Sequence, residues 1–207
     1  MAAASLAPHD LHAWLRSRRS ARRFLPQPVA AAALQRMLET ATYAPNAHNR
    51  QPWRFVILES SQSRAALAAA MGQEFAAALQ AEGLSAAEIE AQLARSAARL
   101  HEAPAAVLLC LDTSVLDTYA DPARTQGELF MAMQSVALAG GQLLLAAQAE
   151  GLGGVWVCAP LLAQAAAQQA LGLPPSWLAQ AVLYLGYPAS EPPPRPRQAV
   201  DDVTRWV

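Results

Sequence analysis

Apolar positions recur along the chain at helical spacing and predict several helices. In residues 29–43 they fall at i, i+3, i+4 and i+7, the pattern of a helix with one core-facing stripe. The members of this stripe are Leu34, Met37, Leu38 and Ala41. Further helices are expected at residues 9–18, with Asp10 as a cap, and at residues 62–80, 85–100 and 161–171. Ser85 and Glu88 have the spacing of a capping box.

Short runs of β-branched, aromatic and other apolar residues predict strands between these helices. The expected strands are residues 53–58, 105–111, 155–158 and 179–185. Because the strands are short and separated by helices, the pattern favours a single sheet flanked by helices, an α+β arrangement. A length of 207 residues fits one domain, residues 1–207.

One long apolar helix is expected at residues 128–150, and its central 21 residues, 129–149, carry no charge. A membrane span has to be considered at this length. Polar residues within it, such as Ser135 and Gln142, favour a buried core helix instead. The pair Gly140 and Gly141 would let another helix approach closely. The preceding loop, residues 112–125, is long enough to be functional, and with residues 62–100 it is expected to shape a substrate pocket.

Composition adds an expectation about assembly and location. Charged residues make up only 15% of the chain, against about 25% in typical domains, and residues 151–190 contain none. A homo-oligomer would bury the excess apolar surface. The net charge of −1 argues against nucleic acid as a partner. Two separated cysteines, Cys110 and Cys158, and the lack of signal-peptide features in residues 1–10 favour the cytoplasm, with Cys158 as a small buried residue.

Three arginines within five residues suggest a phosphate site. Arg18, Arg19 and Arg22 can form bidentate, charge-assisted hydrogen bonds, and Ser20 adds a hydroxyl. A solvated basic turn, or a nucleic-acid patch that includes Arg16 and Arg23, would have the same composition.

A second polar segment, residues 46–53, precedes the first expected strand. Its amides, Asn49 and Gln51, offer donors and acceptors together, which suits the edge of a flat heterocycle. A polar turn before a strand is the simpler alternative.

Both segments resemble motifs of the nitroreductase family of flavin enzymes. The run Arg18-Arg19-Ser20-Ala21-Arg22 is similar to the family's Arg-x-Ser-x-Arg/Lys motif. The run Pro45-Asn46-Ala47-His48-Asn49-Arg50-Gln51-Pro52-Trp53 is similar to Pro-Ser-Ser-x-Asn-x-Gln-Pro-Trp, with Asn46 and Ala47 at the two serine positions. Asn46 could replace the contact of one missing hydroxyl.

Two later segments extend the resemblance. Residues 151–159 are similar to the family's glycine-rich strand, which places Cys158 and Ala159 where main-chain amides meet the flavin ring. Arg195 and Arg197 are similar to a Lys-x-Arg pair that completes the phosphate site. The cofactor-binding residues implied by the resemblance are Arg18, Arg19, Ser20, Arg22, Asn46, Ala47, Asn49, Gln51, Cys158, Ala159, Arg195 and Arg197.

The resemblance implies an FMN-dependent oxidoreductase with the nitroreductase fold, a central, mostly antiparallel sheet flanked by helices. It further implies a homodimer that exchanges extended C-terminal arms and builds each FMN site from both chains. NAD(P)H would reduce FMN in a ping-pong cycle, and a small nitroaromatic or quinone would reoxidise it. The chemistry would take place at FMN, without a catalytic side chain or a metal, and Arg22 would stabilise the anionic reduced flavin.

Other functions stay open at this level. Residues 117–124, 151–156 and 173–177 are similar to the reductase domain of the enzyme that makes the deazaflavin coenzyme, which implies reduction of a deazaflavin precursor. A non-catalytic flavin or deazaflavin-binding protein, and the flavin-cleaving enzymes that make the lower ligand of cobalamin, are further alternatives. The electron donor and the roles of His48 and Arg99 also stay open.

Overall fold

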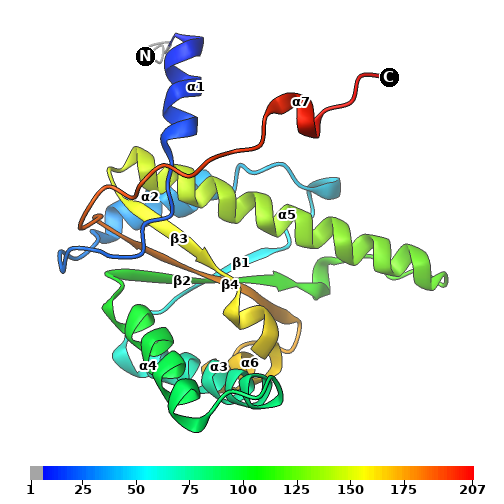
Figure 1. Ribbon diagram of the computed structural model, residues 1–207. Coiled ribbons are helices and arrows are strands. Elements are labelled where there is room, and N and C mark those ends of the chain that lie inside the picture. Colours follow the sequence, from blue (N-terminus) through cyan, green and yellow to red (C-terminus); the bar gives the residue numbers. More distant parts are fainter. Residues whose placement is uncertain (1–6) are drawn as a thin grey trace.

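A four-stranded sheet forms the centre of the computed structural model, which describes residues 7–207 (Figure 1). Its strands are β1 (Trp53–Ile57), β2 (Ala105–Asp112), β3 (Gly153–Val157) and β4 (Trp177–Gly186), in the order β1-β2-β4-β3. Every pair of neighbours is antiparallel. The expected single sheet flanked by helices is therefore confirmed. Residues 1–6, on which part of the signal-peptide expectation rests, lie outside the described residues.

The register places the ends of the two edge strands at opposite corners of the sheet. Trp53 of β1 is level with Leu111 of β2, which pairs with Leu178 of β4. At the other end of β4, Gly186 pairs with Gly153 of β3. From Leu178 to Gly186 the strand rises roughly 26 Å, and three strand spacings add roughly 14 Å across the sheet. Trp53 and Gly153 thus mark a diagonal of about 30 Å.

Two helical layers cover the sheet (Figure 1). On one face lie α2 (Ala31–Ala41) and α5 (Pro122–Ala149), and on the other lie α3 (Ser61–Ala81), α4 (Ala86–Glu102) and α6 (Gln164–Leu171). In α2, Met37 and Ala41 are buried, with Leu34 and Leu38 packed against the same core, which confirms the predicted stripe. Ser85 and Glu88 form the predicted capping box at the start of α4.

Three predicted boundaries are wrong. The helix α5 begins at Pro122, because the Asp121 carboxylate accepts a hydrogen bond from the Ala123 amide and caps it, so the loop after β2 is shorter than expected. The predicted helix at 161–171 is divided into the 3-10 turn η3 (Ala159–Ala163) and α6. In α1 (Pro8–Ser17), Asp10 lies in the first turn and Ala7 occupies the cap position.

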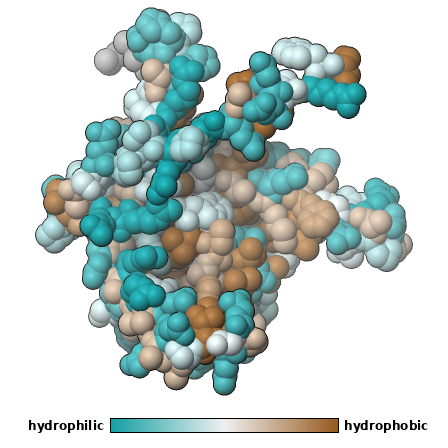
Figure 2. Space-filling model, in the orientation of Figure 1, coloured by the Kyte–Doolittle hydropathy of each residue, from teal (hydrophilic) through white to brown (hydrophobic). Residues whose placement is uncertain are grey.

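The two glycines of α5 lie on different sides of this helix. A Cβ on Gly140 would lie 2.2 Å from the Trp156 ring and 2.8 Å from Leu109, whereas Gly141 faces open space. Gly140 therefore allows close approach of the sheet rather than of another helix. The opposite side of α5 is exposed and apolar and includes Phe130, Met131 and Leu138 (Figure 2). The expectation of a fully buried helix is thus correct for only one side.

By length and composition alone, α5 could cross a membrane. The core helix of a globular domain has the same length and composition, so these two properties do not identify a membrane span. Ten residues of α5 are buried in the structure, and its packed side contributes Val136, Ala139 and Leu143 to the core between helix and sheet. This packing is that of a core helix.

The chain leaves the sheet as an extended C-terminal arm, residues 187–207, which crosses above α5 in Figure 1. The proline-rich part, residues 191–197, has no helix, as predicted, and a short α7 (Val200–Val203) follows it. The side chain of Trp206 is 92% exposed.

Candidate functional site

The first arginine segment lies along the start of β3. The Ala21 amide donates to the Gly154 carbonyl at 3.1 Å, and Phe24 forms a bridge with Pro188 at the base of the C-terminal arm. A Cβ on Gly153 would lie 2.7 Å from both Ala21 and Pro188, so only glycine permits this approach. This packing brings together two segments that lie about 170 residues apart in the sequence.

Residues of these two segments line a common cavity of about 380 Å³, the arginine cavity. Its lining includes the serine and five of the arginines that the sequence predicted: Arg18, Arg19, Ser20, Arg22, Arg195 and Arg197. In the described part of the chain, no carboxylate lines this cavity. Five guanidinium groups without a counter-charge fit a phosphate, which accepts several charge-assisted hydrogen bonds at once.

The second predicted segment forms a strained loop before β1. His48, Asn49 and Gln51 adopt left-handed φ angles of 53°, 52° and 49° around the 3-10 turn η1 (Ala47–Asn49). Such a conformation is costly in non-glycine residues and persists only where surrounding contacts hold it. Two contacts do so here. The Asn46 side-chain oxygen accepts from the Gln51 amide at 2.9 Å, and the Ala47 amide donates to Ser135 Oγ at 3.2 Å.

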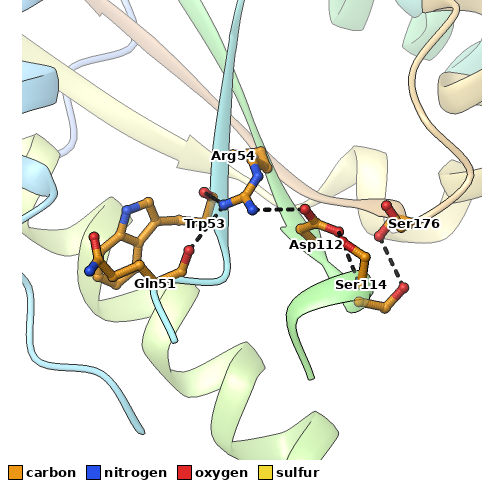
Figure 3. A network of polar contacts seen from close by, with 7 residues as sticks. Gln51, Trp53, Arg54, Asp112, Ser114 and Ser176 are labelled. Atoms are coloured by element: carbon orange, nitrogen blue, oxygen red, sulfur yellow. Dashed lines mark hydrogen bonds and ion pairs between the residues drawn. The ribbon is translucent and has the colours of Figure 1, made fainter. Parts of the chain in front are cut away.

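Arg54 holds the same loop from the other side (Figure 3). Its Nη1 donates to the carbonyl of Gln51 at 3.0 Å, and its Nη2 lies 2.8 Å from Asp112 Oδ2. Asp112 is 4% exposed and accepts from the amide and hydroxyl of Ser114 at 3.0 and 2.6 Å. Burial alone would raise the pKa of Asp112, but hydrogen bonds from Ser114 and Ser176 and the charge of Arg54 outweigh it and lower that pKa.

These contacts leave the two amides of the loop facing outward. The Asn49 and Gln51 side chains are exposed, and Gln51 Nε2 donates to Asn49 Oδ1 at 3.3 Å. The neighbouring Arg50 pairs with Asp117 and ties the loop to the segment that precedes α5. A preformed pair of exposed amides on a braced loop suits recognition of a hydrogen-bonding ring edge.

Sequence reasoning missed the residues that brace this loop. Ser135 was noticed only as a polar residue in an apolar helix, and Arg54 only as one position of a strand. A charge at the second position of the otherwise apolar run 53–58 was the available signal for Arg54, and Asp112 directly after the expected strand 105–111 was the signal for its partner.

The expectation that Cys158 is a small buried residue is wrong. Ala159 is buried, but Cys158 is exposed, because β3 ends at Val157 and the chain turns away into η3. Its Sγ accepts a hydrogen bond from Trp156 Nε1 at 3.0 Å. The second thiol, Cys110, is buried in β2, and burial raises its pKa to about 12.

The two residues left open by sequence lie in different surroundings. His48 is exposed in the strained loop. Arg99 lies on α4 and lines a separate cavity of about 300 Å³ with Arg95 and Phe75. The helix pair α3 and α4 encloses a further, apolar cavity of about 880 Å³.

Within one chain, the predicted arginines and the predicted loop residues form two groups at opposite corners of the sheet, while Cys158 and Ala159 follow the end of β3. The arginine cavity lies beside Gly153, and the strained loop leads directly into Trp53. These positions mark the diagonal of about 30 Å described above. A single small ligand does not span this distance within one chain.

Known proteins resemble this chain over most of its length. The family described as "Nitroreductase family" matches residues 15–187. An NADH dehydrogenase of Thermus thermophilus is 32% identical over 91% of this chain and 92% of its own length. A 5,6-dimethylbenzimidazole synthase of Rhodobacter capsulatus is 35% identical over 84% of this chain and 81% of its own.

Solved structures share the fold. An NADPH:FMN oxidoreductase of Vibrio harveyi, complexed with NAD+, superposes with a TM-score of 0.73 at 21% identity. The superposition covers 94% of this chain and 76% of that one.

Proposed function

Since the chain belongs to the nitroreductase family, we propose that this FMN-dependent oxidoreductase takes electrons from NAD(P)H and passes them to a small aromatic or conjugated acceptor. Nitroaromatics and quinones are the acceptor classes of this proposal. The observation that carries it is the arginine cavity, whose five guanidinium groups match the phosphate of FMN.

The residue roles follow from the two corners of the sheet. Arg18, Arg22 and Arg195, with their neighbours in the arginine cavity, hold the phosphate. Asn49 and Gln51 of the strained loop bind the pyrimidine edge of the flavin ring. Arg22 lies among the phosphate-binding arginines, so we assign it to the phosphate rather than to the reduced ring. Ala159 and Cys158, at the end of β3, lie against the ring.

We further propose that each site combines the arginine cavity of one chain with the strained loop of its partner in a homodimer. The 30 Å diagonal supports this arrangement, because FMN is too short to reach both corners of one chain. The exposed apolar side of α5 and the extended C-terminal arm supply surface for such an interface. The two free thiols, and membership of a family of soluble enzymes, support a cytoplasmic location.

The protein contributes positioning and electrostatics. FMN, when bound, accepts a hydride from the pyridine nucleotide and returns reducing equivalents to the acceptor. The Asn46 side chain and Arg54 hold both main-chain groups of Gln51, so the loop is ordered before the ring arrives. Amide donors at the pyrimidine edge stabilise negative charge that develops there, without reorganisation at the moment of transfer.

The first experiment is an absorbance spectrum of the purified protein, before and after addition of NADH or NADPH. A yellow protein that bleaches supports the proposal, and screening of acceptors follows. A yellow protein that does not bleach would indicate a different reductant, such as a reduced deazaflavin, or a non-catalytic binding role. A colourless protein that cannot be reconstituted with FMN would contradict the proposal.

Replacement of Arg18 and Arg22 by Ala should release FMN, because the phosphate loses two of five guanidinium partners. We expect the dissociation constant of FMN to rise by a factor of at least about 150, because two charged hydrogen bonds at about 1.5–3 kcal/mol each are lost. The control is the double variant Arg95→Ala/Arg99→Ala, which removes two arginines from a different cavity. Stoichiometric FMN in the first variant would rule out the phosphate assignment.

A second function is favoured by the 35% identity to a 5,6-dimethylbenzimidazole synthase. This alternative is the flavin-cleaving reaction, in which reduced FMN is the substrate rather than the cofactor. Oxygen-dependent loss of reduced FMN, with 5,6-dimethylbenzimidazole as the product, would identify it. Stable FMN through many cycles of NAD(P)H oxidation would exclude it.

A further inference from the structure

A cavity of about 650 Å³ lies next to the strained loop. It is bounded by the 3-10 turn η2 (Thr113–Val115), the segment after it and the first two turns of α5. The lining includes Leu116, Asp117, Tyr119, Glu128 and Leu129. Asp117 is the partner of Arg50, a residue of the strained loop, so the wall of the cavity is joined directly to the segment proposed to hold the flavin ring.

Glu128 lies in this cavity and is 2% exposed. Its Oε2 is buried and has no hydrogen-bond partner among residues 7–207. A buried carboxylate without a partner is costly, and proteins retain such a group where something else satisfies it. The other carboxylate of the lining, Asp117, already has its counter-charge in Arg50.

Two arginines lie beside the lining, and neither pairs with Glu128 in the described residues, although Arg50 Nε is buried and lacks a hydrogen-bond partner there. Arg50 pairs with Asp117, and the Arg124 guanidinium lies over the Tyr119 ring at 4.2 Å from its centre. Glu128 is therefore the lining carboxylate that has no ion-pair partner in the described part of the chain. Leu116 and Leu129 contribute apolar surface, and Tyr119 adds an aromatic side chain. This combination suits a flat ring that carries a cation or a strong N–H donor.

We propose that this cavity binds the ring of the electron acceptor through a cationic or N–H-donating substituent that pairs with Glu128. The inference rests on the proposed function, since it names the chemical class of acceptor for that site. Acceptors with an amidinium, ammonium or protonated ring nitrogen are preferred over neutral ones, and carboxylates are disfavoured.

The test uses three ligands of similar shape and different charge, titrated into the purified, FMN-loaded protein by calorimetry. The ligands are benzamidine, benzamide and benzoate, none of which the flavin can reduce. Benzamidine should bind at least tenfold more tightly than benzamide, with benzoate weakest. In Glu128→Gln, which keeps the shape and removes the charge, this preference should disappear. Glu74→Gln, an exposed carboxylate on α3, is the matched control and should behave as the unmodified protein does.

Equal affinities for the three ligands in the unmodified protein, or an unchanged preference in Glu128→Gln, would overturn the inference. If Glu128→Gln does not fold, Thr118→Arg replaces it, because Thr118 is exposed and lines the same cavity. Its added positive charge should weaken benzamidine about tenfold and leave benzamide unchanged, and an equal effect on both ligands would again overturn the inference.

The FMN content and the bleaching by NAD(P)H are measured on the same preparations. Charge preference without flavin reduction would count against the proposed function alone. Flavin reduction without charge preference would count against the cavity alone.

Discussion

At the scale of single residues, the candidate site contains a loop whose unfavourable backbone conformation is held by specific contacts. Gln51 has a left-handed φ, and both of its main-chain groups are occupied, the amide by Asn46 and the carbonyl by Arg54. Arg54 is in turn oriented by the buried carboxylate of Asp112. The chain of contacts therefore extends from the core to the exposed amides of the loop.

Replacement of Arg54 by Met should weaken FMN binding about tenfold, because the Gln51 carbonyl loses its donor and the loop is no longer ordered in advance. Fluorescence titration of FMN measures the effect. Arg36→Met is the control, since Arg36 forms a two-pronged ion pair with Glu150 on the surface. Equal FMN affinity in Arg54→Met and in the unmodified protein would show that the loop needs no such support.

The depressed pKa of Asp112 predicts a dependence of stability on pH. A carboxyl group whose pKa is lower in the folded state stabilises that state above its unfolded pKa, about 3.9. This contribution is lost as the pH falls through the folded pKa. Asp112→Asn should therefore cost about 2 kcal/mol at pH 7 and progressively less below pH 4. Urea unfolding between pH 7 and pH 2.5 measures this, and a constant difference across the range would contradict it.

Which residues were predictable depended on whether a short motif contained them. The motif residues Arg18, Ser20 and Arg22 lie in one cavity, as the sequence indicated. Arg54, Asp112 and Ser135 act through contacts with residues far away in sequence, so local patterns gave only weak signals for them. Cys158 was expected to be buried as a small apolar residue. Its apolar neighbours cannot reveal that an edge strand ends one residue earlier and leaves this side chain exposed.

At the scale of elements, one side of α5 packs against the sheet, and the other is the exposed apolar surface proposed for a partner. Periodicity identified this helix but could not divide its sides, because nearly all of its residues are apolar. Its start was also missed, since residues 122–127 lack an apolar stripe and the cap is formed by Asp121 and Pro122.

Alanine substitutions at the two adjacent glycines test whether only one side of α5 is closely packed. Gly140→Ala should destabilise the protein by about 1–3 kcal/mol, because the new methyl group would clash with the side chains of Trp156 and Leu109. Gly141→Ala adds the same group in open space and should stabilise the helix by up to about 1 kcal/mol. Unfolding midpoints in urea compare the two. Similar losses in both variants would mean that Gly140 has no special packing role.

At the scale of the whole molecule, low charge content and a divided site lead to the same proposal of a dimer. Sequence predicted an apolar interface without locating it, because composition does not specify which side of an element faces solvent. The structure locates one exposed apolar surface on α5, at Phe130, Met131 and Leu138.

Leu138→Asp should prevent dimer formation and, with it, FMN binding, because each site as proposed needs two chains. Sedimentation velocity and the absorbance of bound flavin are measured together. Ala77→Asp, an exposed apolar position on α3 at the other face of the sheet, is the control. A monomer that retains stoichiometric FMN would refute the proposal of shared sites.

The diagonal placement of the two groups of site residues also has a genetic consequence. A chain with a damaged arginine cavity and a chain with a damaged loop would each be inactive as a homodimer. Mixed in one dimer, they would form one site from two intact halves and one site from two damaged halves. Coexpression of two inactive alleles would then restore activity, and flavin stoichiometry would be one per mixed dimer. Intragenic complementation of this kind is impossible for an enzyme whose site lies within a single chain.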